Sequence, residues 1–407
     1  MSRHDPNDGR ARLSRRQLLL GGAVAGVGAV AAAGADRILD PPAAVAAPEE
    51  LNGTQTIAFH GSRQAGVDTP VQAHAAYFGL TLRPEVDRAA LARLMRILTD
   101  DAARLTQGEP ALADSEPELA LVPARLTVTF GYGPEFVRRA GGPTPAWLAP
   151  LPAFTIDRLE PAWSGGDLLV HVAADDPITV AHASRMLLKD TRSFAELAWT
   201  QIGFRRAYGS EAHGVTMRNL FGQVDGTVNP TPETTDFDRV VWIDAPGSWL
   251  HNGTSLVIRR ISLNLETWDR LDRSGREQSV GRTLANGAPL TGVNERDEPD
   301  FAATTPLGFP VIADFSHLRR ARSDDPDERI FRRSYNYDLA GTGGAISDSG
   351  LIFGSYQRDV ARQFTPIQRR LDELDLLNEW TTPIGSSVFA LPPGCAPGGF
   401  IGEGILG

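Results

Sequence analysis

Hydrophobic and polar positions divide the first half of the chain into alternating strands and helices. An apolar, β-prone run at 75–82 predicts a strand, and 85–105 follows with apolar residues at helical spacing. Residues 124–133 alternate in polarity and end in glycines, and 167–175 forms a further strand-like run. A helix is expected over 177–190, with proline in its first turn.

The second half repeats this alternation. Residues 238–244 and 253–266 have strand patterns, and 267–276 has a helical one. The apolar run at 350–357 predicts another strand, followed by a long amphipathic helix over 359–380. No short-period repeat underlies the pattern, so the two halves share only an order of elements.

This shared order predicts an α+β protein made of two related modules, each an antiparallel sheet with helices on one face. The 407 residues are enough for two domains with substantial cores. We place the boundary near 220–236. The expected domains are 47–220 and 221–407, after a leader at 1–46.

The leader has the features of an export signal. Ser14-Arg15-Arg16-Gln17-Leu18-Leu19 resembles a twin-arginine motif, a weakly hydrophobic Ala/Gly/Val segment follows, and Ala44-Val45-Ala46 offers a cleavage site. We expect export by the twin-arginine machinery to a periplasmic, cell-surface or extracellular location. A single membrane anchor is the alternative, but the Gly and Ala content makes 18–35 a poor one.

Charge and cysteine content limit the function classes further. The formal net charge is −10, and removal of 1–46 would take it to −12, which argues against a nucleic-acid partner. Cys395 is the single cysteine of the chain, so neither an intramolecular disulfide nor a multi-cysteine metal site can form. Any metal must depend on histidine, carboxylates or a prosthetic group.

His317 is the most informative of the eight histidines. None of them has a zinc-hydrolase spacing, and a single histidine is more often structural than a ligand. His317, however, follows the apolar, strand-like run 308–316 and precedes six arginines, ending at Arg332-Arg333. One imidazole, apolar walls and nearby cations are what a haem site requires.

The second candidate is Asp225 in "LFGQVDGTVNP" (220–230). An Asp-Gly pair alone usually marks a turn. The flanking Gly222, Gly226 and Pro230 could instead hold the carboxylate on a tight loop, where it could act as a general acid or base.

Together these segments resemble the dye-decolourising peroxidase family, in its exported, twin-arginine-dependent branch. "NLFGQVDGTVNP" is similar to the family's G-x-x-D-G-T motif, "FSHLRRA" to its proximal histidine segment and "RRSYNYD" to its distal arginine motif. Residues 350–394 resemble the family's C-terminal strand and helix. The resemblance implies two ferredoxin-like α+β domains, with haem b between the sheet and helices of the second.

Carried over by position, the resemblance makes His317 the axial ligand of the haem iron. Asp225 falls on the distal carboxylate and Arg333 on the distal arginine. Leu351 and Phe353 match an L-x-F pair that lines the distal pocket.

The resemblance also implies partners for the haem and its substrates. Arg319 and Arg282 are expected near the propionates. A carboxylate hydrogen-bonded to the second nitrogen of His317 would increase its electron donation, and Asp314 is an acid close to His317 in sequence. The reaction would use hydrogen peroxide and an aromatic or dye-like reductant. Bulky reductants would pass electrons through tyrosine or tryptophan, although each candidate is more often a packing residue: Tyr335, Tyr337, Tyr356 and Trp380.

Three readings therefore stay open from the sequence. The first is a peroxidase in which Asp225 and Arg333 assist O–O cleavage. The second is an exported haem protein for iron acquisition, either a deferrochelatase or a ferrous-iron peroxidase. A non-catalytic haem carrier is the third, which would need no distal acid–base pair. The sequence leaves the oligomeric state undecided, with a homo-oligomer as an open alternative.

Overall fold

The computed structural model describes residues 51–407 apart from residues 213, 342, 344 and 345. The predicted export signal at 1–46 lies outside these residues. The elements of the N-terminal half are η1 (Asn52–Thr54), β1 (His74–Leu82), α2 (Arg88–Leu105), η2 (Pro117–Ala120), β2 (Thr127–Tyr132), α3 (Pro134–Ala140), η3 (Pro161–Trp163), β3 (Leu168–Ala174), α4 (Pro177–Thr191) and β4 (Ala195–Phe204).

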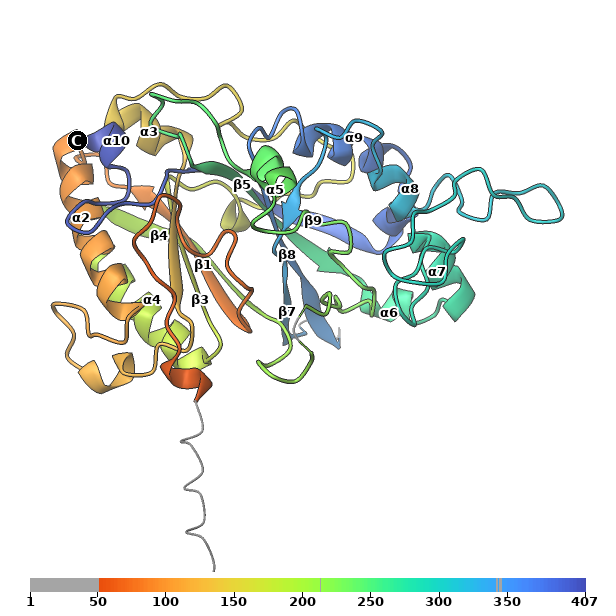
Figure 1. The fold of residues 1–407 in the computed structure, drawn as a ribbon, viewed down its shortest axis with the longest axis horizontal. Helices are drawn as coiled ribbons and strands as arrows, with labels where there is room; N and C mark the ends of the chain where they lie inside the picture. Colours follow the sequence, from red (N-terminus) through yellow and green to blue (C-terminus); the bar gives the residue numbers. More distant parts are fainter. Residues whose placement is uncertain (1–50, 213, 342, 344–345) are drawn as a thin grey trace, which may run out of the picture. The chain divides into compact units, whose positions relative to one another are not determined.

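The C-terminal half continues the alternation (Figure 1). Its elements are α5 (Thr235–Val241), β5 (Thr254–Leu263), α6 (Leu265–Trp268), α7 (Arg273–Val280), α8 (His317–Ala321), β6 (Phe331–Arg332), β7 (Tyr335–Ala340), β8 (Ser347–Gln357), α9 (Phe364–Leu374), η4 (Leu376–Glu379), β9 (Thr381–Leu391) and α10 (Glu403–Leu406).

All strands belong to one antiparallel sheet that closes on itself. The order is β5-β9-β2-β3-β1-β4-β7-β8-β6, and β5 also pairs with β8. The two halves meet at one residue pair on each side, Tyr132 with Ala390 and Phe204 with Asn336. The prediction of a mixed helix and sheet fold is confirmed, but the sheet is continuous through both halves rather than separate in each.

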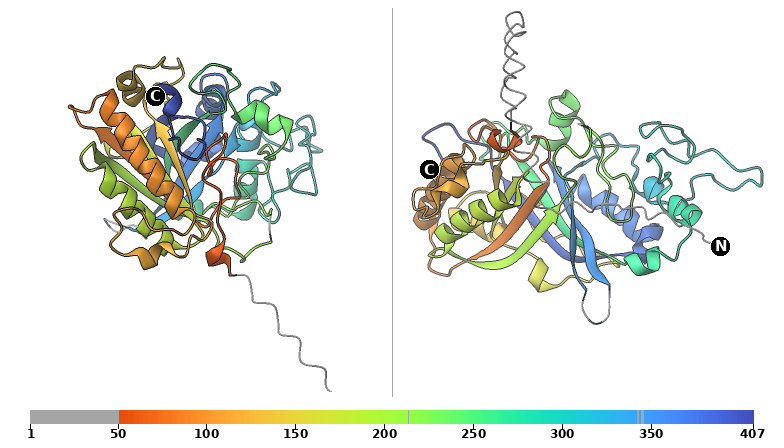
Figure 2. Two further views of the ribbon diagram at one scale, coloured as in Figure 1. Left: turned by 60° about the vertical axis from the view of Figure 1, so that its left-hand side comes forward. Right: turned by 90° about the horizontal axis from the view of Figure 1, so that it is seen from below.

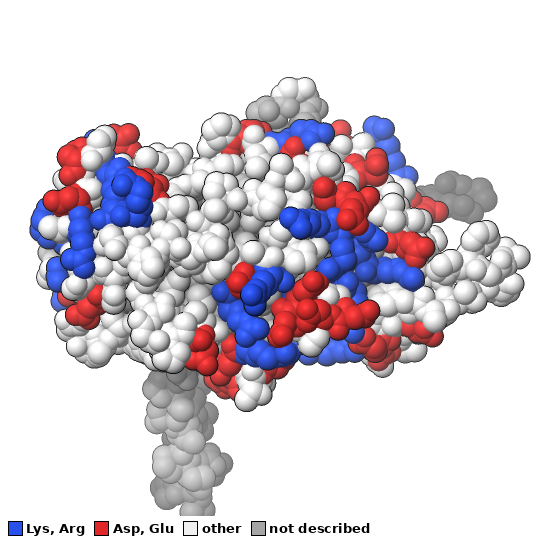
Figure 3. Space-filling view, turned by 90° about the horizontal axis from the view of Figure 1, so that it is seen from above, with Lys and Arg blue, Asp and Glu red and all other residues white. Residues whose placement is uncertain are grey.

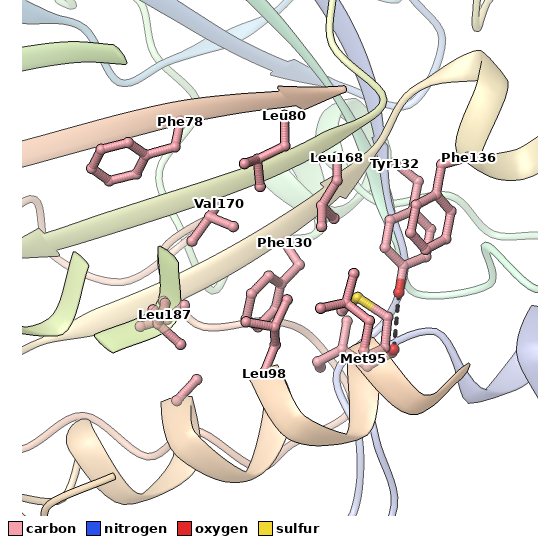
Figure 4. Close-up of a cluster of buried hydrophobic side chains, with 14 of the residues drawn as sticks. Phe78, Leu80, Met95, Leu98, Phe130, Tyr132, Phe136, Leu168, Val170 and Leu187 are labelled. Carbon is pink, nitrogen blue, oxygen red and sulfur yellow. Dashed lines mark hydrogen bonds between the residues drawn. The ribbon is translucent and has the colours of Figure 1, made fainter. Parts of the chain in front are cut away.

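Helices α2 and α4 pack side by side over the N-terminal strands (Figures 1 and 2). Each begins at an aspartate cap, Asp87 or Asp176, whose carboxylate accepts a backbone N–H of the first turn. The helices bury Met95, Leu98 and Leu187 against one face of the strands (Figure 4). Every residue of β2 and of β3 is buried, because the helices cover one face and the C-terminal half covers the other.

The strands predicted at 75–82, 124–133, 167–175 and 350–357 are confirmed, as are the helices at 85–105 and 177–190. The strand prediction at 238–244 was wrong, because residues 235–241 form α5. There the Thr234 hydroxyl accepts the Phe237 N–H, and Phe237, Val240 and Val241 are buried at helical spacing.

Two other expectations need correction. The apolar run before His317 forms no strand, and the bridge between Thr304 and Pro310 is its single ladder contact in the described residues. The long helix expected over 359–380 is shorter, since α9 ends at Leu374 and Asp375 is extended before η4.

Strand β8 separates two environments, because neighbouring side chains of a strand point to opposite faces. Leu351 and Phe353 line a cavity on one face. Ile352 and Tyr356 point to the other face and join a buried cluster shared with the N-terminal half. The same alternation in the chain segment paired with β8 determines whether Arg332 or Arg333 reaches the cavity.

The surface shows no uniform charge on the face drawn in Figure 3, where acidic and basic side chains intermingle. Ion pairs such as Arg239–Asp327, 2.9 Å between Nη1 and Oδ1, connect charges of opposite sign. Among the helices of the described part of the chain, none has the length and apolar character needed to cross a bilayer.

Candidate active site

A cavity of about 740 Å³ lies in the C-terminal half. One of its walls is the face of β5, β8 and β9 that carries Ile261, Leu351 and Pro383, and the other is formed by α8 and α9. Its volume is in the usual range for cofactor pockets. Five residues predicted from the sequence line it: Asp225, Arg282, His317, Leu351 and Phe353.

His317 is the first residue of α8 and is held by an aspartate far away in sequence. Its Nδ1 lies 2.6 Å from Oδ2 of Asp375, the residue between α9 and η4. The other oxygen of Asp375 accepts the Leu377 N–H at 3.0 Å, which fixes the carboxylate. Because Nδ1 is occupied, Nε2 is the nitrogen available to a ligand in the cavity.

The electrostatics of this pair favour a strongly polarised imidazole. Burial lowers the pKa of His317, but the charge and hydrogen bond of Asp375 outweigh burial, so the pKa is raised. Asp314, the acid considered from the sequence, is not the partner. Its carboxylate pairs with Arg319, 3.0 Å from Oδ1 to Nε, and is largely exposed.

Asp225 lies on an irregular loop that is fastened to β6. The Asp225 N–H donates to Met217 O at 2.8 Å, and the next residue, Gly226, has a φ of 124°, which only glycine adopts readily. The Asn229 amide exchanges two hydrogen bonds with the backbone of Arg332, at 2.8 and 3.1 Å. Oδ1 of Asp225 then lies 3.0 Å from Nη1 of Arg332.

The arginine on the cavity is therefore Arg332, and the sequence prediction of Arg333 was wrong by one residue. Arg332 lines the cavity, whereas Arg333 does not. The Arg333 N–H donates to Gly354 O at 2.8 Å, which holds this segment extended beside β8. Neighbouring side chains there point to opposite faces, so the Arg333 guanidinium turns away and donates to Thr69 O.

Of the two arginines expected near the propionates, Arg282 lies on the cavity and Arg319 does not. Arg282 lines the cavity, with Nη1 donating to Gly287 O at 2.7 Å and Glu295 O at 2.9 Å. Burial and the neighbouring Arg332 lower the pKa of Arg282. Arg319 is not among the lining residues, because its guanidinium pairs with Asp314 and donates to Phe301 O at 2.9 Å.

Four residues of the site were missed from the sequence: Arg259, Asn229, Arg332 and Asp375. Arg259 lines the cavity from β5, is 1% exposed and pairs with Asp157 through Nη2. Its Nε and Nη1 have no hydrogen-bond partner within the described residues. Strand alternation could have pointed to Arg332, but Asp375 is 58 residues from His317 and no local pattern connects them.

Comparison with known proteins shows the family of this chain. The family described as "Dyp-type peroxidase, N-terminal" matches residues 64–205, and "Dyp-type peroxidase, C-terminal" matches residues 216–396. The chain belongs to the Dyp-type peroxidase family. The resemblance to this family, inferred from four segments, is thus confirmed, and the protein is an oxidoreductase that acts on peroxide.

The relatives of this Dyp-type peroxidase include proteins named dye-decolorizing peroxidase and proteins named deferrochelatase. A dye-decolorizing peroxidase of Thermobifida fusca is 34% identical, with 99% of each chain covered. A deferrochelatase of Escherichia coli O6:K15:H31 is 32% identical at the same coverage. The crystal structure of a DyP-type peroxidase from Cellulomonas bogoriensis is 53% identical, covers 88% of this chain and 99% of its own, and has a TM-score of 0.85.

Haem is the cofactor of this peroxidase, and the cavity fits it. A single imidazole whose Nε2 is available faces apolar walls that include Leu351 and Phe353. Buried Arg259 has two unsatisfied N–H groups, and a carboxylate such as a propionate would satisfy them. Axial histidine, apolar walls and cationic anchors are the donor set that haem requires.

Proposed function

We propose that this peroxidase cleaves hydrogen peroxide with the help of Asp225 and Arg332, and that Nε2 of His317 would hold the iron of the haem. The observation that carries this proposal is the 3.0 Å pair of Asp225 and Arg332 in the same cavity as the 2.6 Å pair of His317 and Asp375. Bound haem supplies the iron and the electrons that peroxide reduction needs.

Asp225 has the role of proton carrier. Its carboxylate accepts the proton of one peroxide oxygen and delivers it to the other oxygen, which then leaves as water. Geometry supports this role, because the loop fastened by Asn229 presents the carboxylate to the cavity beside a cation.

Arg332 and Asp375 have supporting roles. Arg332 remains cationic, so it cannot be the base, but it orients Asp225 and stabilises negative charge as the O–O bond breaks. Asp375 fixes the His317 tautomer and increases the electron donation of the imidazole. Arg282 and Arg259 are proposed as propionate partners, and Leu351 and Phe353 as apolar walls of the distal pocket.

The reductant proposed is a bulky aromatic compound or dye. The name of the Thermobifida fusca relative supports this class. The second candidate is release of iron from haem, which the 32% identity to a deferrochelatase over nearly the whole chain supports. Both candidates use the same cavity.

One experiment separates these two candidates. Purified holoprotein is incubated with hydrogen peroxide and a dye, and separately with haem and a ferrous chelator. Peroxide-dependent bleaching of the dye, lost in Asp225→Asn, supports the peroxidase. Metal-free porphyrin together with chelated iron supports the deferrochelatase. If neither bleached dye nor metal-free porphyrin forms, both candidates are contradicted.

Two broader proposals accompany this function. We propose that 47–220 and 221–407 are ferredoxin-like modules. Each half repeats one strand order, β2-β3-β1-β4 and β7-β8-β5-β9, which supports this view. We also propose that the chain is exported through a twin-arginine signal cleaved after Ala46. Replacing Arg15 and Arg16 by lysine should leave the protein in the cytoplasm.

A further inference from the structure

The face of the N-terminal strands that points to the C-terminal half carries a row of polar side chains. Thr129, His171, Tyr77 and Gln201 are register partners across β2, β3, β1 and β4. Tyr77 and His171 stack with ring centroids 4.1 Å apart. Each of the four is at most 1% exposed. Polar residues in such a row at the centre of a protein need partners.

Strands of the C-terminal half place further polar groups opposite this row. Tyr335 meets Tyr77 edge-on, with ring centroids 6.3 Å apart. Tyr356 follows on β8, on the face turned away from the cavity. Arg333 lies on the same side. A Cβ built on Gly354 would lie 3.0 Å from Arg333 O and 3.8 Å from the Tyr77 hydroxyl, so the Arg333 backbone and this hydroxyl are close neighbours. The positive charge of Arg333 also acts to lower the pKa values of Tyr77, Tyr335, Tyr356 and His171.

Most of these polar atoms have no hydrogen-bond partner within the described part of the chain. The unsatisfied atoms are both ring nitrogens of His171, Oε1 and Nε2 of Gln201, the hydroxyls of Tyr77, Tyr335 and Tyr356, and Nε of Arg333. Leaving a buried donor or acceptor unpaired costs about 1–3 kcal/mol. So many in one place indicate a bound species that the protein atoms surround.

The positive charges there, Arg333 and Arg205, form no ion pair with a carboxylate of the described residues. Arg333 donates to Thr69 O and, at 3.4 Å, to Oε1 of Gln72, both neutral. Arg205 donates to Ser334 O at 2.8 Å and lies 5.1 Å from the Tyr335 ring. Burial and the charge of Arg333 lower the pKa of Arg205, so the two cations destabilise each other. An anion between them would offset that cost.

The tyrosine hydroxyls of the cluster are donors as well. Burial raises the pKa values of Tyr77, Tyr335 and Tyr356, so their hydroxyls keep their protons. Burial lowers the pKa of His171 to about 3, so its ring is neutral. Asp68 is an acid whose charge reaches Arg333, but it is half-buried and its pKa is raised by burial. The cluster thus has donors and positive charge that no carboxylate of the described residues pairs with.

We infer that Arg333, Tyr77, Tyr335, Tyr356 and Gln201 enclose a small monovalent inorganic anion of halide size, with Arg333 Nε as its principal donor. The site is separate from the haem cavity, because β8 lies between them and presents alternate residues to each. It also gives Arg333, one residue after the arginine on the cavity, a role of its own.

The most direct test uses crystals of the holoprotein grown in sodium bromide. Anomalous diffraction at the bromine absorption edge should show a bromide peak within hydrogen-bond distance of Arg333 Nε and of at least one of the three tyrosine hydroxyls. Water alone at this position would overturn the inference. This test needs no variant and so does not depend on a substituted protein folding.

A solution test excludes binding that occurs at crystal concentrations alone. Raising sodium bromide from 1 to 100 mM at constant ionic strength, balanced with sodium gluconate, should raise the thermal midpoint of the holoprotein by about 2–4 °C. Arg333→Gln should lose this response, and Tyr356→Phe, which removes one hydroxyl, should weaken it. Arg206→Gln is the matched control, because Arg206 is exposed and paired with Glu211. An equal response in Arg333→Gln and Arg206→Gln, or none in the unsubstituted protein, would refute the site.

Discussion

The functions that we propose for the two carboxylates of the cavity differ because their partners differ. Asp375 contacts the imidazole of His317, so in this proposal it would act on the haem iron through His317. Asp225 contacts the guanidinium of Arg332, and in this proposal its carboxylate would exchange protons with peroxide. Each carboxylate is positioned by backbone groups close to it in sequence, Leu377 in one case and Met217 in the other.

Asp375→Asn tests the first of these interactions. The neutral amide of the variant is a weaker acceptor than a carboxylate for the hydrogen bond from Nδ1 of His317. The imidazole is then less polarised, so we expect His317 to donate less electron density to iron. We expect a loss of about 10–100-fold in peroxidase activity or haem affinity. The Soret band of the purified protein should also shift in position or intensity.

Asp314→Asn is the matched control for this prediction. Asp314 is nearer to His317 in sequence but pairs with Arg319 at the surface. It should therefore leave the Soret band and the activity unchanged. An effect of Asp314→Asn as large as that of Asp375→Asn would contradict the assignment of Asp375 as the partner of His317.

At this scale the sequence predicted the anchors of the site but not their neighbours. His317 and Asp225 could be found because each sits in a contiguous motif. Arg332 and Arg333 are adjacent, and only the direction of the extended chain beside Gly354 distinguishes them. Asp375 could not be found, because its contact with His317 depends on how α9 packs against α8.

At the scale of elements, the contact between α2 and α4 contains a pair of acids. Asp101 is 3% exposed, and one of its oxygens accepts the Leu112 N–H at 2.9 Å. Burial and the hydrogen bond and charge of Asp101 raise the pKa of Asp190 to about 7. Folding therefore favours the protonated form of Asp190, which has an ordinary pKa of about 3.8 when exposed.

This pair predicts a pH dependence of stability. A carboxyl with a raised folded-state pKa stabilises the fold fully below about pH 4, and that contribution is lost as the pH rises through about 7. Asp190→Asn removes the charge, so it should raise the free energy of unfolding more at pH 7.5 than at pH 5. Urea unfolding of the holoprotein at both pH values measures the difference.

Asp100→Asn provides the control on the same helix pair, because Asp100 is exposed on α2. Its effect should be small and equal at the two pH values. If the effect of Asp190→Asn on the free energy of unfolding depends on pH no more than that of Asp100→Asn, then Asp101 does not raise the pKa of Asp190.

Long periodic elements were predictable, and short or context-dependent ones were not. Helices α2 and α4 have caps and apolar spacing that identify them locally. Residues 238–244, which were predicted as a strand, contain Val240-Val241-Trp242, whose β-branched and aromatic residues favour a strand. The cap of α5 at Thr234 and the burial of Phe237 against Phe331 overrode that preference.

At the scale of the whole molecule, closure of the sheet joins the two halves. Strand β4 approaches β7 closely at Gly203, where an added Cβ would lie 2.5 Å from Cβ of Tyr335 and 3.1 Å from Cδ1 of Ile352. The halves can pair at Phe204 and Asn336 because Gly203 has no side chain. Sequence patterns cannot show such a contact, since it joins residues more than 130 positions apart.

Gly203→Ala should therefore destabilise the protein. The methyl group overlaps Tyr335, so the strands must separate at a cost of about 1–3 kcal/mol in the free energy of unfolding. Gly61→Ala is the control, since the nearest atom there would be 3.5 Å away. Denaturant unfolding of both holoproteins measures the difference, and equal stability would show that the closure tolerates a side chain at Gly203.

The central claim is that Arg332, and not its neighbour Arg333, acts with Asp225 on peroxide. Stopped-flow mixing of the holoprotein with equimolar hydrogen peroxide, followed at the Soret band, tests it most directly. We expect Arg332→Leu to slow the peroxide-dependent change by about 10²–10³-fold. Arg333→Gln, although it alters a buried cluster, should stay within about threefold of the unsubstituted protein. A slow reaction in Arg333→Gln combined with a normal one in Arg332→Leu would contradict the account.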